Sequence, residues 1–295
     1  MQTIVVAGGT GLIGKQLVNL LRKSNYQVNV LSRNPKLEGE FFWDPREGKI
    51  DEKAIVDASV FVNLSGAGIA EEKWTVQRKL YLQQSRVGTN VFLYSIREKM
   101  PKLEHFICAS GINAYGFKDD AKNYSESDPY GSDFVSQLVK VWELSAEQFK
   151  TDVKVATVRT AIVLDGGGGA LQKMVPIVKK GLASPLGSGS QMMPWIHVDD
   201  LVNIYLHIIQ NKLEGPYNAL SGSVTNAVFT KTLAKVLKKP YWAPKVPAFV
   251  MRLMYGEMSI ILLNGVKASH EKISNTGFQF QFENLEDALA DVLKS

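Results

Sequence analysis

TIVVAGGTGLIG, residues 3–14, begins with apolar residues, three of them β-branched, and continues into the spacing Gly8-x-x-Gly11-x-x-Gly14. A short apolar run, then glycines, then the amphipathic stretch Leu12 to Lys23 predicts a strand, a tight turn and a helix. In this context a Gly-rich turn places a dinucleotide pyrophosphate at the helix N-terminus. The alternative is a tight strand-to-helix turn that binds nothing.

Each glycine of the turn has its own expected role. Gly8 allows a tight turn without a Cβ, Gly11 leaves the backbone bare so that a pyrophosphate can approach, and Gly14 lets the helix pack on the strand. We therefore expect the turn to supply one group of nucleotide contacts. Its members are Gly8, Thr10, Gly11, Leu12, Ile13 and Gly14.

The second predicted strand, Val28 to Leu31, distinguishes between the two nicotinamide dinucleotides. It runs into Ser32, Arg33 and Asn34, without the carboxylate that would accept hydrogen bonds from the ribose 2′-OH of NAD. A guanidinium binds phosphate oxygens in pairs, so Arg33 with Ser32 suits the 2′-phosphate of NADP. The sequence favours NADP(H) over NAD(H), and the alternative is that Arg33 only ends an exposed strand.

Small residues follow the predicted strand Val60 to Leu64. The chain reads Asn63-Leu64-Ser65-Gly66-Ala67 at a point where the carboxyl end of a parallel strand is expected. Ligands of open α/β sheets lie at this edge, so Leu64, Ser65 and Gly66 are further candidates for nucleotide contact. A plain turn is the alternative.

Strands and helices alternate beyond this point, which is typical of a doubly wound parallel sheet. The further expected elements are helices within Trp74 to Lys99 and at Asp133 to Lys150, and strands at His105 to Ala109 and Lys154 to Leu164. At the glycine run 166–169 the regular alternation of predicted strands and helices ends. The chain continues with a helical stretch, a loop from Ser184 to Ser190, a strand at Met193 to His197, a helix at Asp199 to Gln210, a strand around Tyr217 and mostly helix from Asn226 to Ser295 with a turn at Pro240 to Pro247.

The predicted fold class is therefore α/β, a Rossmann-like doubly wound parallel sheet with a small, mostly helical C-terminal substrate lobe. We expect an NADP-binding domain over residues 1–165, which also receives segments of about 190–220. Residues 166–295 would hold the substrate lobe and the returning elements.

Composition narrows the environment and the partners. The net charge of +5 has no block of like charges, so we expect a small-molecule substrate and no nucleic acid. Apolar runs are too short to cross a bilayer, and the N-terminus lacks the features of a signal peptide. Cys108 is the single cysteine, which indicates a reducing compartment, so we expect a cytoplasmic protein without membrane partners. Both a monomer and a homodimer are compatible with the sequence.

With these segments the chain resembles the extended short-chain dehydrogenase/reductase superfamily. More narrowly, it resembles an atypical group described as NAD-dependent epimerase/dehydratase family proteins with a C-terminal domain of unknown function. The likeness spans the chain, from the glycine motif through Trp43-Asp44-Pro45, Ser85-Arg86, Ala114-Tyr115-Gly116, Trp142-Glu143, Arg159 and 187–191 to 195–200 and 277–280. It implies that Ser32, Arg33, Leu64, Ser65 and Arg86 contact the nucleotide.

The resemblance stops at the catalytic dyad. Active members of the superfamily place a Tyr and a Lys four residues apart on one helix face. Here only Tyr241 has a Lys four residues later, and the prolines around it disfavour a helix. When the dyad is aligned on this chain with Glu143 as the reference residue, Val135 and Val139 fall at the positions of the Tyr and the Lys. The usual Ser position falls on Gly111, with Ser110 one residue early.

Two functional hypotheses follow. One is an NADP-dependent oxidoreductase or epimerase with rearranged acid-base groups, in which Ser110, Tyr115 and Tyr130 supply protons. The other is a nucleotide-binding sensor or regulatory module that has lost catalysis. The alternative to proton donation by Tyr115 is that its side chain only packs against the lobe. Gln191 and Trp195 are the candidates for substrate contact.

Histidines do not suggest a metal site. His105, His207 and His270 are scattered along the chain. His197 stands close to Asp199 and Asp200, but an Asp before an apolar periodic run is typical of a helix N-cap. We therefore expect a structural role for this segment, with Asp199 or Asp200 as the cap.

Overall fold

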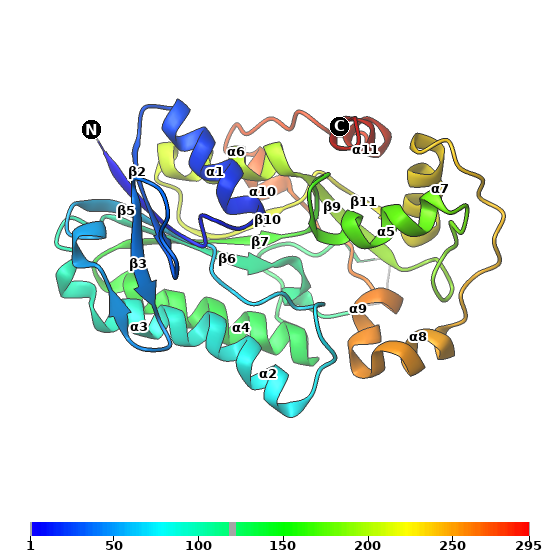
Figure 1. Cartoon of the computed structure of the whole chain (residues 1–295), viewed down its shortest axis with the longest axis horizontal. Coiled ribbons are helices and arrows are strands. Elements are labelled where there is room, and N and C mark those ends of the chain that lie inside the picture. The colour runs from blue at the N-terminus through cyan, green and yellow to red at the C-terminus, as the bar shows by residue number, and fades with distance from the viewer. Residues whose placement is uncertain (1, 118–121, 295) are drawn as a thin grey trace.

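The computed structural model describes residues 2–117 and 122–294 (Figure 1). Its main sheet has eight strands in the order β10-β7-β6-β5-β1-β2-β3-β4, and all neighbours are parallel except β3 and β4. The strands are β1 (Thr3–Ala7), β2 (Gln27–Ser32), β3 (Glu40–Asp44), β4 (Lys49–Ile50), β5 (Ala58–Asn63), β6 (His105–Gly111), β7 (Lys154–Thr160) and β10 (Gly215–Ala219). From β1 the chain adds β2, β3 and β4 on one side and later β5, β6, β7 and β10 on the other, so the order of the strands reverses at β1. Ligands bind at this switch point in doubly wound folds.

Helices cover both faces of the main sheet. In Figure 1, α1 (Leu12–Lys23) and α6 (Val198–Asn211) lie on one face, and α2 (Val76–Gln83), α3 (Thr89–Ser95) and α4 (Phe134–Glu147) lie on the other. Alternate residues of β1 serve the two cores. Ile4 and Val6 pack beneath α1 and α6, whereas Val5 and Ala7 face the core that α3 and α4 cover. Because both faces are buried, β1 is continuously apolar rather than alternating.

A second, three-stranded sheet forms the centre of the C-terminal lobe. Its order is β11-β9-β8, with strands β8 (Ile162–Leu164), β9 (Met192–His197) and β11 (Gly222–Thr225). The helices of the lobe are α5 (Gly169–Lys179), α7 (Asn226–Val236), α8 (Ala248–Tyr255), α9 (Ile260–Leu263), α10 (Glu271–Ser274) and α11 (Leu285–Val292). Leu171, Trp195, Phe229, Leu233 and Leu289 fill its separate apolar core.

The doubly wound sheet and the helical lobe confirm the predicted fold class, but two elements differ from the prediction. The expected strand Lys154 to Leu164 is two strands, because β7 ends at Thr160 and β8 pairs with β9 in the other sheet. The partner strand β10 ends at Ala219, opposite Thr160. The residues after Thr160 therefore have no strand of the main sheet to pair with on that side. The hairpin of β3 and β4 was not predicted. Within residues 2–117 and 122–294, no helix is both long and apolar enough to cross a bilayer.

Candidate functional site

The turn after β1 has the backbone that its glycines predict. Gly8 has a φ of +78°, and a Cβ at this position would lie 3.0 Å from the Leu64 carbonyl carbon. Gly14 packs against the same turn, where a Cβ would lie 2.2 Å from the Gly8 carbonyl oxygen. That oxygen also accepts a hydrogen bond from the Gly11 amide at 3.0 Å. Gly8 and Gly14 therefore maintain the close contact between β1 and α1.

Gly11 leaves the start of α1 open. It is the N-cap residue, no side chain caps the helix, and the first turn carries no acidic residue. A Cβ on Gly11 would contact only the Gly8 oxygen, at 3.3 Å. The amide groups of the first turn and the positive end of the helix dipole are therefore available to an anion.

The lobe approaches this turn more closely than the sequence indicated. Gly168 is the N-cap of α5, and a Cβ on it would lie 2.8 Å from Cδ1 of Leu12. The glycine run 166–169 therefore places the start of α5 beside the start of α1. Such a run marks a close backbone approach, and this was the available signal for a second wall of the site.

Arg33 follows β2 at the carboxyl edge of the sheet and is exposed. In the described part of the chain its guanidinium has no hydrogen bond or ion pair. It lines a hollow of about 650 Å³, together with Gly66, Ala67, Gly68, Glu71, Glu72, Thr75, Gln77, Arg78 and Tyr81. Ser32 is buried, and its Oγ accepts a hydrogen bond from the Asn34 amide at 3.2 Å.

The segment after β5 closes the other side of the turn. The Leu64 amide donates to the Ala7 carbonyl oxygen at 2.9 Å, and Asn63 Oδ1 accepts from the amide and the hydroxyl of Ser65. These bonds bring Leu64 and Ser65 next to Gly8. Gly66 follows them along the wall of the hollow.

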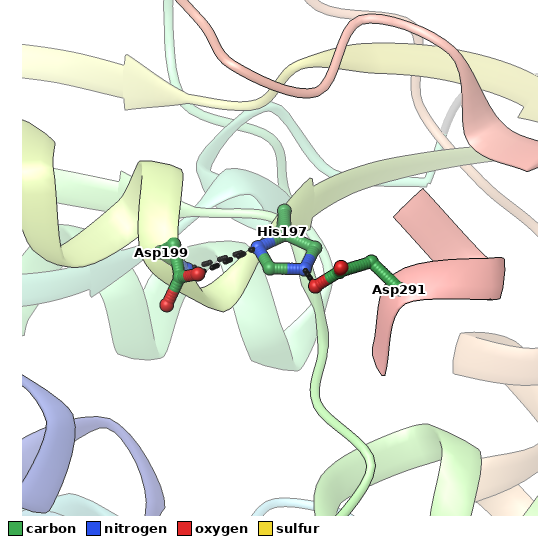
Figure 2. A group of neighbouring side chains, drawn as sticks. All are labelled: His197, Asp199 and Asp291. Carbon is green, nitrogen blue, oxygen red and sulfur yellow. Dashed lines mark hydrogen bonds and ion pairs between the residues drawn. The ribbon is translucent and has the colours of Figure 1, made fainter. Parts of the chain in front are cut away.

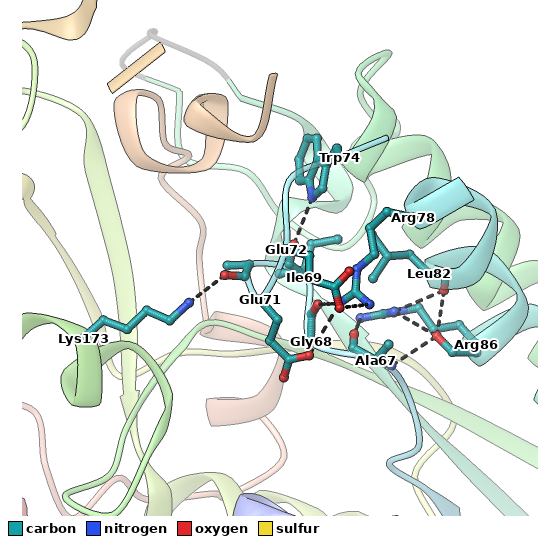
Figure 3. Close-up of polar contacts among 12 residues, drawn as sticks. Ala67, Gly68, Ile69, Glu71, Glu72, Trp74, Arg78, Leu82, Arg86 and Lys173 are labelled. Carbon is teal, nitrogen blue, oxygen red and sulfur yellow. Dashed lines mark hydrogen bonds and ion pairs between the residues drawn. The ribbon is translucent and has the colours of Figure 1, made fainter. Parts of the chain in front are cut away.

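Arg86 lies beneath this loop and binds its backbone (Figure 3). Its guanidinium donates to the Ala67 carbonyl at 2.8 Å and to the Leu82 carbonyl at 3.1 Å, and burial lowers its pKa to about 10. Four consecutive carbonyls of the loop each accept from a different side chain. The pairs are Ala67 with Arg86, Gly68 with Arg78 at 2.8 Å, Ile69 with Trp74 at 2.9 Å and Ala70 with Lys173 of α5 at 2.6 Å. Arg86 thus shapes the wall of the hollow.

The three candidate proton donors converge on one buried ion pair. Arg159 of β7 binds Glu143 of α4 through two hydrogen bonds, Nε to Oε1 at 2.9 Å and Nη2 to Oε2 at 2.8 Å. The Ser110 hydroxyl donates to one carboxylate oxygen, and the Tyr130 hydroxyl donates to the other at 2.6 Å. Tyr115 accepts from Arg159 at 3.0 Å. Neither Glu143 nor Arg159 was predicted as a site residue, although a buried Arg and Glu in adjacent elements form a strong electrostatic unit.

This environment keeps both phenols protonated. Burial raises the pKa of Tyr115 to about 12, and its hydroxyl donates to Asn218 at 2.6 Å. Burial, together with the charge of Glu143, also raises the pKa of Tyr130. In the usual dyad the Lys lowers the pKa of the Tyr, so the electrostatics are reversed here. Tyr130 is partly exposed, whereas Tyr115 and Ser110 are buried.

The positions of the missing dyad are apolar. Val135 and Val139 are both buried on α4. Val139 lies against the backbone after β6, since a Cβ on Gly111 would be 3.5 Å from its Cγ2. Val139 therefore stands at the position expected for the Lys.

The two candidate substrate residues lie in the interior of the lobe. Gln191 is buried, and its amide donates to the Leu186 carbonyl at 3.0 Å and to the Leu262 carbonyl at 2.8 Å. Trp195 is 1% exposed and belongs to the apolar core of the lobe. In this conformation Gln191 joins the loop at Leu186 to α9, and Trp195 packs in the core of the lobe.

His197, Asp199 and Asp291 form a compact group, shown in Figure 2, which could suggest a metal ion. His197 Nδ1 accepts a hydrogen bond from the Asp199 amide at 3.1 Å, so the ring proton of the neutral side chain is on Nε2. Nε2 faces a carboxylate oxygen of Asp291 at 3.4 Å. A metal ligand would need a free lone pair on Nε2, and the two Asp side chains approach the ring from opposite sides.

The prediction that Asp199 or Asp200 caps α6 is therefore wrong. His197 is the N-cap, and Asp199 and Asp200 lie in the first turn. The reason is a long-range contact that the local pattern does not show. Asp200 accepts hydrogen bonds from the amides of Gln281 at 2.8 Å and Phe282 at 3.0 Å, and so attaches the C-terminal segment to α6.

Comparisons with known families agree with this architecture. Residues 4–219 match the NAD dependent epimerase/dehydratase family, and residues 246–292 match a domain of unknown function, DUF1731. Epimerase family protein SDR39U1 of Mus musculus is 34% identical over 98% of this chain and 99% of its own length. Epimerase family protein SA0724 of Staphylococcus aureus is 34% identical over the whole of both chains.

Solved structures extend the likeness to the fold. A crystal structure of human epimerase family protein SDR39U1 with NADPH has a TM-score of 0.90 and 31% identity over 99% of both chains. A UDP-glucose 4-epimerase of Thermotoga maritima, solved with UDP-glucose, has a TM-score of 0.79 at 18% identity and covers 99% of this chain and 98% of its own. At that identity the second likeness concerns the fold alone.

Proposed function

This chain belongs to the NAD-dependent epimerase/dehydratase family, and from that premise we propose that it is an NADP(H)-dependent oxidoreductase or epimerase. Its substrate would be a carbonyl compound or a nucleotide sugar. The observation that carries the cofactor assignment is Arg33, an unpaired guanidinium within the described residues, at the end of β2 and on the wall of a large hollow. The uncapped start of α1 suits the pyrophosphate, and the human relative crystallised with NADPH supports the same choice.

The proposed chemistry needs a proton at the substrate oxygen. Hydride transfer from NADPH to a carbonyl carbon leaves negative charge on the oxygen, which a protonated side chain must neutralise. Tyr130 suits this role better than Tyr115 or Ser110, because only Tyr130 is partly exposed. Glu143 holds the Tyr130 hydroxyl, and its own position depends on Arg159.

A catalytically silent NADP(H) sensor is the second candidate. The observation in its favour is the pair Val135 and Val139 in the dyad positions, together with the raised pKa of Tyr130, which burial and Glu143 cause. A phenol that stays protonated cannot serve as a base near neutral pH. The two candidates share the cofactor site and differ in turnover.

Cofactor titration with variants tests the proposal. We expect Arg33→Ala to weaken NADPH by about tenfold or more and to leave NADH almost unchanged, because a charge-assisted bond to the 2′-phosphate is lost. Gly11→Val should abolish binding of both, because its side chain would occupy the path of the pyrophosphate. Gly11 suits this test because its φ of −77° is open to any residue. Affinities would be measured by NADPH fluorescence, and folding by circular dichroism.

The outcomes separate the candidates. Equal losses of NADPH and NADH in Arg33→Ala would contradict the NADP assignment. Oxidation of bound NADPH by members of a panel of aldehydes, ketones and nucleotide sugars would identify an enzyme. Tight NADPH binding with no turnover on the whole panel would favour the sensor.

A further inference from the structure

A second arginine stands next to Arg33 because of the register between two strands. β2 and β3 are parallel, with Ser32 opposite Phe42, so their carboxyl ends lie at the same edge of the sheet. Arg33 follows Ser32 directly, and Asp44 is the last residue of β3. Two residues later the chain reaches Arg46. The ends of β2 and β3 therefore bring two cations to the same edge of the sheet, and Arg33 also lines the hollow.

Asp44 fixes Arg46 in this corner. Its Oδ1 accepts hydrogen bonds from the Arg46 amide at 3.0 Å and from Nε at 3.4 Å, and its Oδ2 accepts from Nη2 at 3.3 Å. The Asp44 side chain is 12% exposed, whereas that of Arg46 is 61% exposed. A nearly buried carboxylate thus holds Nε and Nη2 of the guanidinium, and Nη1 makes no hydrogen bond within residues 2–117 and 122–294.

Within the group of Arg33, Asp44 and Arg46 the charges do not cancel, and the acidic residues that line the hollow are paired with Arg78. Arg46 and, more weakly, Arg33 lower the pKa of Asp44, so this carboxylate is ionised at neutral pH and lies within electrostatic reach of both guanidiniums. One negative charge therefore stands between two positive charges. A phosphate monoester carries a charge of about −1.5 to −2 at pH 7 and would compensate the remainder.

The neighbouring hollow suits the rest of such a ligand. Arg33 and Tyr81 both line it, and Tyr81 also lies near Arg46. Its volume of about 650 Å³ is within the range for a small-molecule site. Arg78 is buried and lies over the Tyr81 ring, 5.3 Å from its centroid, whereas Tyr81 is exposed and offers an aromatic surface for a base.

We propose that Arg46, positioned by Asp44, is a second ligand of the adenosine 2′-phosphate, so that β2 and β3 each contribute one arginine to the same phosphate. This inference rests on the proposed NADP(H) binding. Arg46 is then a specificity-determining residue, and Asp44 is a positioning residue that does not itself contact the ligand.

The test compares NADPH and NADH affinities of the whole chain and of single variants. We expect Arg46→Ala to weaken NADPH by about tenfold, the loss typical of one charge-assisted bond, and to leave NADH within about twofold. Lys49→Ala is the matched control, because Lys49 lies in the same hairpin and its ammonium pairs with Glu47 at 2.7 Å. This control should bind both cofactors like the unmodified chain.

Asp44→Asn distinguishes positioning from simple repulsion. Removal of a negative charge beside a phosphate would by itself tighten NADPH, whereas loss of the contact that holds Arg46 should weaken it. We expect weaker NADPH binding, with NADH unchanged. Tighter or unchanged NADPH binding in Asp44→Asn would overturn the positioning role.

Other outcomes also decide the matter. Equal losses of NADPH and NADH in Arg46→Ala, or no loss of either, would overturn the role of Arg46 while the proposed function stands. If the unmodified chain binds neither cofactor, the proposed function fails first and this inference fails with it. Competition by 2′-AMP against 5′-AMP gives the same comparison without the nicotinamide half.

Discussion

At the scale of single residues, the most consequential group is the ion pair of Glu143 and Arg159. Both side chains are almost fully buried, and Ser110, Tyr115 and Tyr130 use the remaining hydrogen-bonding capacity of the pair. A buried pair gains little over apolar residues of the same size, because both charges lose their hydration. Removal of one partner is a different matter, since it leaves the other charge buried and alone.

We therefore expect Glu143→Gln to lower the free energy of unfolding by roughly 3–5 kcal/mol. The double variant Glu143→Leu/Arg159→Met should lose much less, because no buried charge is left over. Chemical denaturation followed by fluorescence would measure both. If the single and double variants lost the same stability, the pair would not be the electrostatic unit that its geometry indicates.

The residue scale also shows what the local sequence could predict. Gly11 and Gly14 contact neighbours within a few positions, so their spacing and context were sufficient to predict the turn, whereas Gly8 also lies against the distant Leu64. Glu143 and Arg159 lie on different elements, and only the fold brings them together. The same holds for the bond between Arg86 and the Ala67 carbonyl, whereas contact of Arg86 with the nucleotide stays a prediction.

At the scale of elements, His197 connects three segments. Its Nδ1 caps α6, its Nε2 faces Asp291 of α11, and its ring stacks on Phe282 at 3.8 Å between centroids. The local pattern favoured an Asp cap because Asp is common at this position, whereas the fold uses Asp200 to bind the amides of Gln281 and Phe282. The preference for Asp at N-caps reflects contacts within the helix end, and it does not include contacts with a distant segment that packs on the helix.

His197→Ala should destabilise the protein by roughly 1–3 kcal/mol through loss of the cap and of buried packing. His197→Asn should recover part of that loss, because Asn can cap the helix although it cannot reach Asp291. Thermal unfolding measures both variants. In the same assay, addition of Zn²⁺ or EDTA should leave the unmodified chain unchanged. A rise with Zn²⁺ that His197→Asn abolishes would instead indicate a metal centre.

Strand prediction failed where partners change. Residues 154–164 form one stretch rich in β-branched residues, and this pattern alone predicts one strand. The stretch divides because β10 ends opposite Thr160, and β8 joins β9. The hairpin of β3 and β4 escaped prediction because β4 has only two residues. The first error concerns pairing between segments that are distant in sequence, whereas the hairpin pairs Trp43 with the nearby Ile50.

At the scale of the whole molecule, the positive charge is concentrated in the C-terminal lobe. Residues 166–198 and 215–256 contain nine Lys and Arg and no Asp or Glu. The start of α5 lies next to Leu12 in the turn after β1, so one end of this basic region adjoins the proposed cofactor site. A field of one sign raises the local concentration of ligands of the opposite sign and depends on ionic strength. An anionic substrate, such as a nucleotide sugar, is therefore favoured over a neutral carbonyl compound.

A nucleoside diphosphate serves as the probe of this prediction. Its dissociation constant should rise several-fold between about 0.05 M and 0.5 M salt, because screening shortens the reach of the lobe's charges. Lys179→Glu/Lys180→Glu at the end of α5 should weaken the probe at low salt and lose this effect at high salt. Lys99→Glu/Lys102→Glu is the matched control, since these two lysines already pair with Glu52 and Asp57 outside the lobe. Equal effects of the two double variants would mean that net charge, rather than its place in the lobe, attracts the ligand.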